Sequence, residues 1–120
     1  VSVEIGECVT SIGDSAFYGC SGLTSIDIPN SVVRIGQFAF ISCRGLTSCT
    51  IGSGIAYIEN LAFYYCSSLQ SITVRATTPP LLGDDVFYGT NNCPIYVPSN
   101  KVSSYKSAWS DYSDRIQAIP

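Results

Sequence analysis

The chain has 120 residues, of which 46% are hydrophobic and 12% charged, enough apolar material for one core but too little chain for two ordinary domains. Its nine acidic and six basic residues are scattered and give a net charge of −3, so no basic face is available to bind nucleic acid. Histidine is absent, which removes the usual proton carrier near neutral pH and weakens the case for an enzyme.

The chain begins inside a repeated unit. The segment Val3-Glu4-Ile5-Gly6 alternates as a strand does and matches a segment that recurs further on. The sequence opens at Val1 without methionine or a basic and apolar leader, and no apolar run approaches the roughly 18 residues of a membrane span. We therefore expect a trimmed segment of a longer chain, with further repeats upstream and no membrane span.

A repeat of 23 residues dominates the sequence. The pair Ala-Phe recurs at this interval at Phe17, Phe40 and Phe63, and a fourth copy at Phe87 is one residue out of register. Other apolar positions advance with it. One set lies before the phenylalanine: Ile12, Ile35 and Ile58. Four sets follow it: Cys20, Cys43 and Cys66; Leu23, Leu46 and Leu69; Ile26, Cys49 and Ile72; and Ile28, Ile51 and Val74. A unit this short cannot bury its apolar face alone, which predicts stacked coils.

Each unit contains one predicted strand. The pattern Leu-x-x-Ile-x-Ile alternates apolar and polar residues, as in a half-buried strand, so five successive segments are expected to pair in parallel on one face. Bends that close the coils are marked by Gly13, Pro29, Gly36, Ser42, Gly52 and Gly54. The other sides of each coil are predicted to be short irregular or 3₁₀ turns.

The unit resembles the bacterial leucine-rich repeats of the BspA-like type, whose pattern is Ile-Pro-x-Ser-Val-x-x-Ile-Gly-x-x-Ala-Phe-x-x-Cys-x-x-Leu-x-x-Ile. Residues 28–49 follow it almost throughout, with Cys49 in place of the closing isoleucine. The resemblance covers residues 1–98 and departs at Glu59, where the pattern has glycine, and at Thr90, where it has cysteine. It implies an α/β leucine-rich-repeat solenoid of right-handed coils with a parallel β-sheet on one face.

Residues 99–120 are expected to form a helical C-terminal cap. Pro98 ends the last strand, and from Ser99 to Gln117 the period becomes helical, with Ser99 or Asn100 as N-cap. One apolar face is formed by Val102, Tyr105, Trp109, Tyr112 and Ile116. Such a helix would cover the last coil. The segment from Thr77 onwards also resembles the C-terminal end of surface proteins from Bacteroides-like bacteria, which implies that Pro120 lies near the natural end.

The cysteines are predicted to be structural. Cys20, Cys43 and Cys66 recur once per coil at an inward position, so they should stack about 5 Å apart as small buried side chains. No C-x2-C pair is present, and we expect no metal site and no cofactor. Outside this ladder lie Cys8, Cys49 and Cys93. A disulfide involving one of these three stays open, and Cys8 is the expected exposed thiol.

No catalytic motif is found. The pair Asp84-Asp85 is interpreted as a solvated loop, because no third carboxylate is near in sequence and stacking brings only Asn60, Leu61 and Ala62 beside it. The sequence has no glycine-rich phosphate loop, no nucleophile elbow and no histidine-dependent triad. We therefore predict a protein that is not an enzyme.

Two outward-facing ladders are candidate contact surfaces. The first is a polar strip on the sheet, led by Glu4 and formed by Ser25, Asp27, Ser48, Thr50, Ser71, Thr73 and Tyr96. The second is aromatic and comprises Tyr18, Tyr64 and Tyr88, with Ile41 in the second coil and Tyr65 alongside. Alternatives stay open for both, since the strip is also explained as a solvated sheet face and the aromatic ladder as packing along the coil corners.

The resemblance implies a secreted or surface-displayed module of a bacterium, non-catalytic, that binds a host or bacterial surface protein or a glycan through the solenoid face. The alternative is a stalk or spacer that presents an upstream domain. Because the first strand, from Val3 to Ile5, lacks a neighbour, self-association at the N-terminal coil is a further hypothesis.

Overall fold

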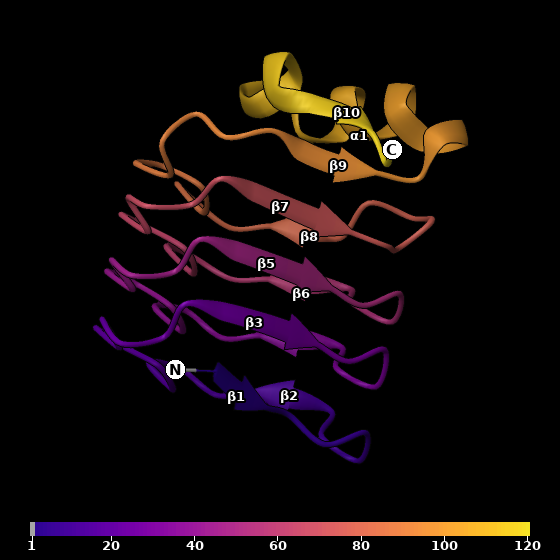
Figure 1. Ribbon diagram of the computed structural model, residues 1–120. Coiled ribbons are helices and arrows are strands. Elements are labelled where there is room, and N and C mark those ends of the chain that lie inside the picture. The colour runs from indigo at the N-terminus through magenta and orange to yellow at the C-terminus, as the bar shows by residue number, and fades with distance from the viewer. Residues whose placement is uncertain (1) are drawn as a thin grey trace.

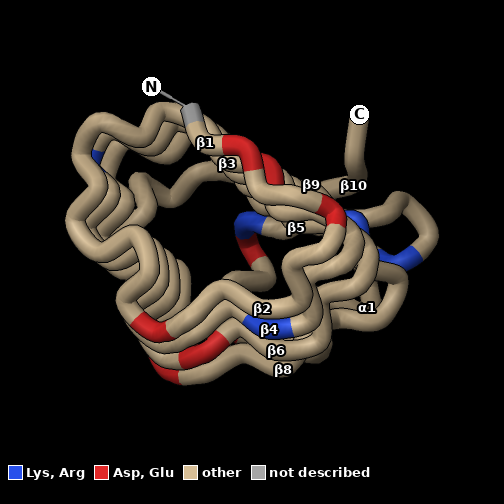
Figure 2. The backbone as a smooth tube through the Cα atoms, turned by 90° about the horizontal axis from the view of Figure 1, so that it is seen from below, with Lys and Arg blue, Asp and Glu red and all other residues tan. Residues whose placement is uncertain are grey.

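The computed structural model describes residues 2–120, which form a stack of similar coils with a helical segment over the last one (Figure 1). Seen along the stack, successive coils nearly superimpose, and each runs through two strands and an irregular segment before it returns to the first side (Figure 2). The interior of this outline is filled by the apolar side chains of the repeat. The predicted leucine-rich-repeat solenoid is confirmed.

A parallel sheet of six strands forms one face. Its strands are, in spatial order, β1 (Ser2–Glu4), β3 (Ser25–Ile28), β5 (Ser48–Ile51), β7 (Ser71–Val74), β9 (Ile95–Val97) and β10 (Ile116–Ala118). The register places Ile26 beside Cys49 and Cys49 beside Ile72, so equivalent positions of the repeat are neighbours across the sheet. The predicted pairing of five segments is confirmed, and β10 adds a sixth strand that the sequence did not reveal.

A second parallel sheet lies on another side, where we expected only turns. It consists of β2 (Ser11–Ile12), β4 (Arg34–Ile35), β6 (Tyr57–Ile58) and β8 (Leu81–Leu82). The inward isoleucines of the first three strands, Ile12, Ile35 and Ile58, were recognised as core positions, and β8 has Leu82 in their place. Two residues are too few for an alternating pattern to be detected, which is why the strands themselves were missed.

Stacked phenylalanine rings run through the interior. The ring centroids of Phe17 and Phe40, and of Phe40 and Phe63, are 5.0 Å apart, and those of Phe63 and Phe87 are 5.8 Å apart. Three of the four side chains are fully buried, whereas Phe17, in the first coil, is partly exposed. One ring per coil therefore builds a continuous core, as the repeat predicted.

The cysteine ladder has a hydrogen-bonding role as well as a packing role. The Cys43 thiol donates to the Phe17 carbonyl at 3.1 Å, and the Cys66 thiol donates to the Phe40 carbonyl at 3.0 Å. Both side chains are buried. The prediction was wrong for Cys20, which is exposed because it lies in the first described coil, whose outer side has no neighbour.

The three cysteines outside the ladder differ from one another. Cys8 is exposed, as expected, whereas Cys49 and Cys93 are buried in the core. All six cysteines within residues 2–120 are free thiols.

Aspartate and asparagine side chains accept hydrogen bonds from the next coil. The side-chain oxygen of Asn60 accepts the amide of Asp84 at 2.8 Å, and the carboxylate of Asp14 accepts the amide of Gln37 at 3.1 Å. A Cβ at Gly36 would lie 2.5 Å from a carboxylate oxygen of Asp14 and 2.6 Å from the backbone nitrogen of the same residue, so only glycine fits there. In the third coil, Glu59 replaces the glycine of the repeat. In the second coil, Gln37 stands at the position that Asp14 has in the first.

The C-terminal cap contains a helix, but a shorter one than predicted. A 3₁₀ turn at Ser99–Lys101 leads into α1 (Val102–Ala108), which is followed by a second 3₁₀ turn at Ser110–Arg115 and by β10. Neither Ser99 nor Asn100 caps the helix, since no side-chain hydrogen bond is made at its start. The expectation of one continuous helix to Gln117 was wrong.

Tertiary contacts explain why the helix ends early. Trp109 leaves the helical conformation, with φ −111° and ψ 55°, and its indole nitrogen donates to the Pro80 carbonyl at 3.0 Å. Ile116 then pairs with Ile95 as the chain rejoins the sheet. The predicted apolar face is nevertheless the face that packs, since Tyr105, Trp109 and Ile116 are buried.

Arg115 closes the irregular fourth coil. Its guanidinium donates to the Cys93 carbonyl at 2.8 Å, to the Phe87 carbonyl at 3.3 Å and to the Thr90 hydroxyl at 2.7 Å. Thr90 replaces the ladder cysteine and is buried, and its hydroxyl donates to the Phe87 carbonyl at 2.7 Å. One side chain of the cap thereby satisfies the polar groups that the degenerate repeat leaves at its end.

Candidate functional site

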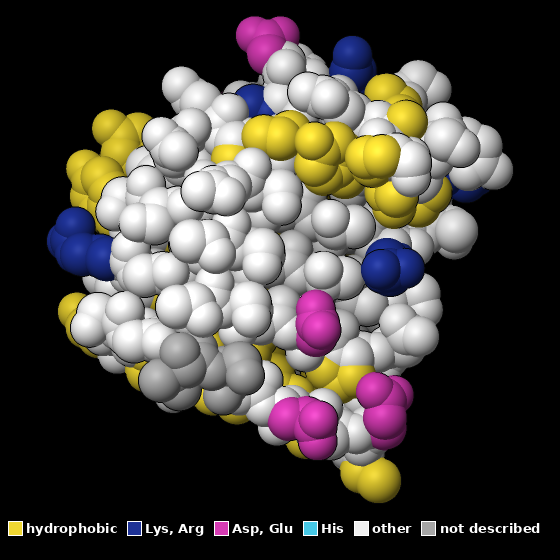
Figure 3. All heavy atoms as spheres, in the orientation of Figure 1, with side chains coloured by type: hydrophobic (Ala, Val, Ile, Leu, Met, Phe, Trp, Pro, Cys, Tyr) yellow, Lys and Arg dark blue, Asp and Glu magenta, His cyan; other side chains and the backbone are white. Residues whose placement is uncertain are grey.

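The predicted polar strip lies on the outer face of the larger sheet. Two rows cross it in register: the first comprises Ser25, Ser48 and Ser71, and the second Glu4, Asp27, Thr50, Thr73, Tyr96 and Gln117. We refer to these nine residues as the sheet strip. The middle of this face carries few charged or hydrophobic side chains (Figure 3). Gln117 was not predicted to belong to it, because the residue was assigned to the cap helix.

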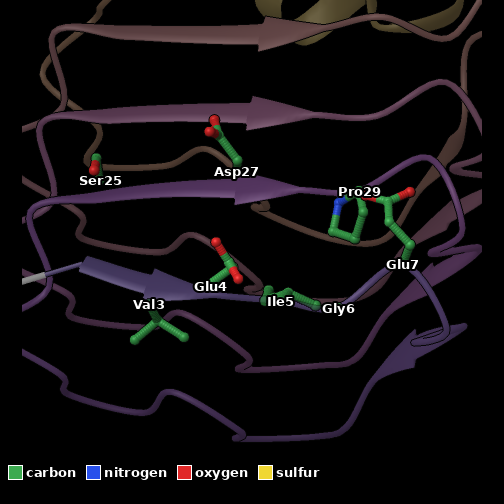
Figure 4. A pocket seen from close by; sticks show the side chains of 8 residues that line it. All are labelled: Val3, Glu4, Ile5, Gly6, Glu7, Ser25, Asp27 and Pro29. Carbon is green, nitrogen blue, oxygen red and sulfur yellow. The ribbon is translucent and has the colours of Figure 1, made fainter.

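The N-terminal end of the sheet strip is hollowed and acidic. A hollow of about 590 Å³ is lined by Val3, Glu4, Ile5, Gly6, Glu7, Ser25, Asp27 and Pro29. Figure 4 shows the carboxylates of Glu4 on β1, of Asp27 on β3 and of Glu7 in the loop after β1. The strip therefore changes from acidic at β1 and β3 to uncharged at β5 and β7.

A second hollow lies between the last coil and the cap. It measures about 480 Å³ and is lined by Leu82, Gly83, Asp84, Asp85, Ala108, Trp109, Ser110, Asp111 and Tyr112. The cap thus brings Asp111 to the pair Asp84-Asp85, which the sequence had placed beside the preceding coil only. Within residues 2–120 no group of three or more histidine, cysteine, aspartate or glutamate side chains is arranged to hold a metal ion.

The aromatic ladder is concentrated in the third and fourth coils. The rings of Tyr64 and Tyr88 stack with centroids 5.4 Å apart, and Tyr65 meets them edge-on at 4.4 and 5.8 Å. Tyr18, which is 63% exposed, lies two coils from Tyr64 and shares no ring contact with this group. We refer to Tyr64, Tyr65 and Tyr88 as the tyrosine cluster.

The backbone of Tyr65 is left-handed, with φ 55°. The equivalent positions hold Gly19 (φ 65°), Ser42 (φ 58°) and Gly89 (φ 76°), so every coil demands this conformation here. A residue with a Cβ pays about 1–2 kcal/mol for it. The sequence marked a bend here at Ser42 but did not indicate the left-handed backbone, because glycine occupies the position in only two of the four coils.

An ion-pair ladder crosses the smaller sheet. The Arg34 guanidinium lies 2.9 Å from the Asp14 carboxylate and 3.3 Å from the Glu59 carboxylate, joining three coils. The hydrogen bond to Asp14 raises the pKa of Arg34, although all three side chains remain substantially exposed. Surface pairs of this kind add little stability and leave this side of the solenoid charged and hydrated.

Several buried titratable groups are held in their neutral forms. Burial raises the pKa of the Cys49 thiol and of the Tyr105 phenol, whose hydroxyl donates to the Ala76 carbonyl at 2.6 Å. A hydrogen bond with Cys43 and burial together raise the pKa of Cys66. These thiols stay protonated near neutral pH and have the character of core groups.

The repeat, the two parallel sheets and the ladders define a leucine-rich-repeat solenoid. Residues 1–114 match the family model described as the BspA type leucine-rich repeat region, in six copies. The chain therefore belongs to the BspA-type leucine-rich-repeat family. Membership supports a protein-interaction or structural module. None of the helices within residues 2–120 is long and apolar enough to cross a membrane.

Solved structures of bacterial proteins are similar to this chain. A leucine-rich-repeat protein of Treponema pallidum is 34% identical with a TM-score of 0.68, over 73% of this chain and 41% of that one. A leucine-rich-repeat protein of Bacteroides capillosus is 32% identical with a TM-score of 0.61, over 74% of this chain and 63% of that one. A third, from Bacteroides ovatus, is 28% identical with a TM-score of 0.67, over 92% of this chain and 28% of that one.

The chain thus spans between about three tenths and two thirds of the length of these three proteins. No curated protein matches it.

Proposed function

We propose that this chain is a non-catalytic recognition module that is secreted or displayed on a bacterial cell surface and binds a host or bacterial surface protein or a glycan through the sheet strip. The observation that carries the proposal is the register of the larger sheet, which aligns hydroxyl-bearing side chains from four coils on one open face. None of these side chains is needed for the core, which lies on the opposite side of the strands.

The composition of the strip suits adaptable contacts. Serine and threonine hydroxyls both donate and accept hydrogen bonds, and Tyr96 adds a partly exposed ring with a polar tip. Asp27 and Glu4 give one end a negative charge, which favours partners that carry basic groups there. Adhesion to a surface through many weak contacts along a solenoid is consistent with this arrangement.

A screen against purified host matrix proteins and an oligosaccharide array tests the proposal. We expect T50K/T73K to lose at least tenfold in binding to at least one ligand of the parent, since two lysines would charge the uncharged middle of the strip. The matched control is S11K/Y57K, which adds the same charge to exposed positions of β2 and β6 on the smaller sheet and should bind as the parent does. Equal binding by all three proteins would contradict a role for the strip.

A stalk or spacer that presents an upstream domain is the second candidate. It is favoured by the regular register between coils, which makes a stiff, extendable rod out of repeats. The spacer predicts that no ligand in the screen binds the parent and that lysines on the strip change nothing.

The same proposal includes self-association at the first coil. β1 is the edge of the larger sheet, and an apolar hollow of about 240 Å³ is lined there by Val3, Phe17, Cys20, Gly22 and Leu23. A second copy of the chain would pair its own edge strand and cover this hollow. Light scattering at high concentration should give the mass of a dimer, and a monomer would remove this part of the proposal.

A further inference from the structure

The tyrosine cluster lies away from the sheet strip. Its three residues belong to the irregular segments that lead from the smaller sheet back to the larger one, Tyr64 and Tyr65 between β6 and β7 and Tyr88 between β8 and β9. Tyr65 is 40% exposed and Tyr88 is 52% exposed, so both rings are partly covered by their neighbours and partly in water. The cluster is therefore a feature of the surface, and its role is not explained by the core.

Tyr65 has a left-handed backbone, which is strained for a residue with a Cβ. Ser15, Phe38, Leu61 and Asp85 have the same left-handed backbone at another corner of the coil; the two small polar residues are exposed there, whereas the bulky apolar side chains of Phe38 and Leu61 are largely covered by the protein. Tyr65 is more exposed than either, in a column where two coils use glycine. Residues with a strained backbone are enriched at active sites and ligand-binding sites.

The neighbouring coil is fitted to this ring. A Cβ at Gly89 would collide with the side chain of Tyr65. Glycine at this position of the fourth coil therefore leaves room for the Tyr65 ring of the third coil. Partial desolvation and a hydrogen bond with Tyr65 raise the pKa of Tyr64, with smaller contributions from Tyr88 and Asp85. The rings are thus held in one arrangement, with little conformational entropy left to lose on binding.

The geometry favours a platform over a cage. A cage for a cation needs a gap between rings, so that the cation lies within about 6 Å of each centroid. Here the three centroids are 4.4 to 5.8 Å from one another, which is direct contact and leaves no such gap. The exposed parts of Tyr65 and Tyr88 amount to about 200 Å², far less than the roughly 800 Å² per partner of a stable protein interface.

We propose that the tyrosine cluster is a saccharide-binding platform, separate from the sheet strip, that takes an uncharged pyranose ring. The apolar C–H face of such a ring packs on the exposed aromatic surface, and the phenol hydroxyls at its rim exchange hydrogen bonds with sugar hydroxyls. Asp85, two residues before Phe87 in the same segment as Tyr88, is an exposed acceptor for further sugar hydroxyls. Its charge, with that of Asp84, disfavours sialylated or sulfated sugars.

The test uses an array of neutral oligosaccharides built on glucose, galactose and N-acetylglucosamine, together with sialylated and sulfated counterparts. We expect the intact chain to bind at least one neutral oligosaccharide, and Tyr65→Gly and Tyr88→Ser each to weaken that binding at least tenfold. Tyr57→Ser is the matched control, because Tyr57 is a 46% exposed tyrosine on the smaller sheet outside the cluster. T50K/T73K should also bind as the parent does, which separates this site from the sheet strip.

Thermal unfolding of the same variants distinguishes binding from packing. Glycine relieves the left-handed backbone, so Tyr65→Gly should melt at or above the temperature of the parent while it loses the saccharide. The proposal is overturned if the chain binds no neutral oligosaccharide, if only sialylated or sulfated sugars bind, or if binding survives in both variants. Equal losses in Tyr57→Ser would overturn it as well.

Discussion

The first and the last coil of the described chain are built from the same repeat but differ in how their outer apolar layer is covered. At the C-terminal end Phe87 is fully buried, with the rings of Trp109 and Tyr112 centred 5.6 and 5.4 Å away. At the N-terminal end Phe17 stacks on one side only, on Phe40, and is partly exposed. The repeat therefore builds the interior, while sealing an end requires residues that lie outside the repeat.

Truncating an interior ring should have the largest effect. Phe63→Ala empties a fully buried layer between two stacked rings and is expected to cost about 3–5 kcal/mol in the free energy of unfolding. Phe17→Ala should cost markedly less, because its ring is stacked on one side only. Chemical denaturation of both variants measures the difference, and equal costs would mean that coverage does not set the contribution of a coil.

Removing the clamp of the cap should come next. Arg115→Met deletes hydrogen bonds to the Phe87 and Cys93 carbonyls and to Thr90, and is expected to cost about 2 kcal/mol. Arg75→Met, at an exposed arginine, is the control and should stay within about 0.5 kcal/mol of the parent. If the two variants unfold alike in denaturant, Arg115 does not seal the end.

Alkaline pH should weaken the buried interior. The raised pKa values of Cys49 and Tyr105 mean that their neutral forms stabilise the fold fully below the ordinary pKa of each group. Stability is then lost as the pH rises above about 9, by up to about 1.4 kcal/mol per pH unit for each group. The unfolding free energy should be flat between pH 6 and 8 and fall above this range.

Cys49→Val provides the control for this pH dependence. The variant lacks one buried ionisable group, so its curve should fall less steeply than that of the parent at alkaline pH. Parallel curves would show that ionisation of this thiol is not linked to unfolding.

The smallest effect is expected in the cysteine ladder. Cys66→Ala loses a buried thiol that donates to the Phe40 carbonyl and should cost about 1 kcal/mol. Cys20→Ala removes the equivalent but exposed thiol of the first coil and should be neutral within about 0.5 kcal/mol. A comparable loss in both variants would argue that the ladder acts independently of coverage.

Much of the interior was predictable because the repeat reports it directly. Equivalent positions such as Phe40 and Phe63 stack in register, so a residue type that recurs in the sequence identifies a contact that recurs in the structure. The path of the cap was less predictable, because the break at Trp109 depends on a hydrogen bond to Pro80, 29 residues earlier in the chain. The same limit explains why Gln117 was not placed on the sheet strip.

The candidate surfaces were predictable as rows but not as shapes. Strand alternation identified Asp27, Thr50 and Thr73 as outward positions, and the register places them side by side. The acidic hollow at β1 and the contact of Tyr65 with Gly89 arise from loops and turns, whose side-chain directions are not encoded in a period.

The measurement that tests the account most directly is residue-resolved amide hydrogen exchange, because matched hydrogen bonds recur in every coil. The amides of Phe17, Phe40 and Phe63 donate to the carbonyls of Ala39, Ala62 and Val86 in the next coil, at 2.7, 2.7 and 3.1 Å. If coverage of the ends sets stability, protection should be lowest at Phe17 and highest at Phe63, despite the longer bond there. Uniform protection, or the slowest exchange at Phe17, would contradict the account.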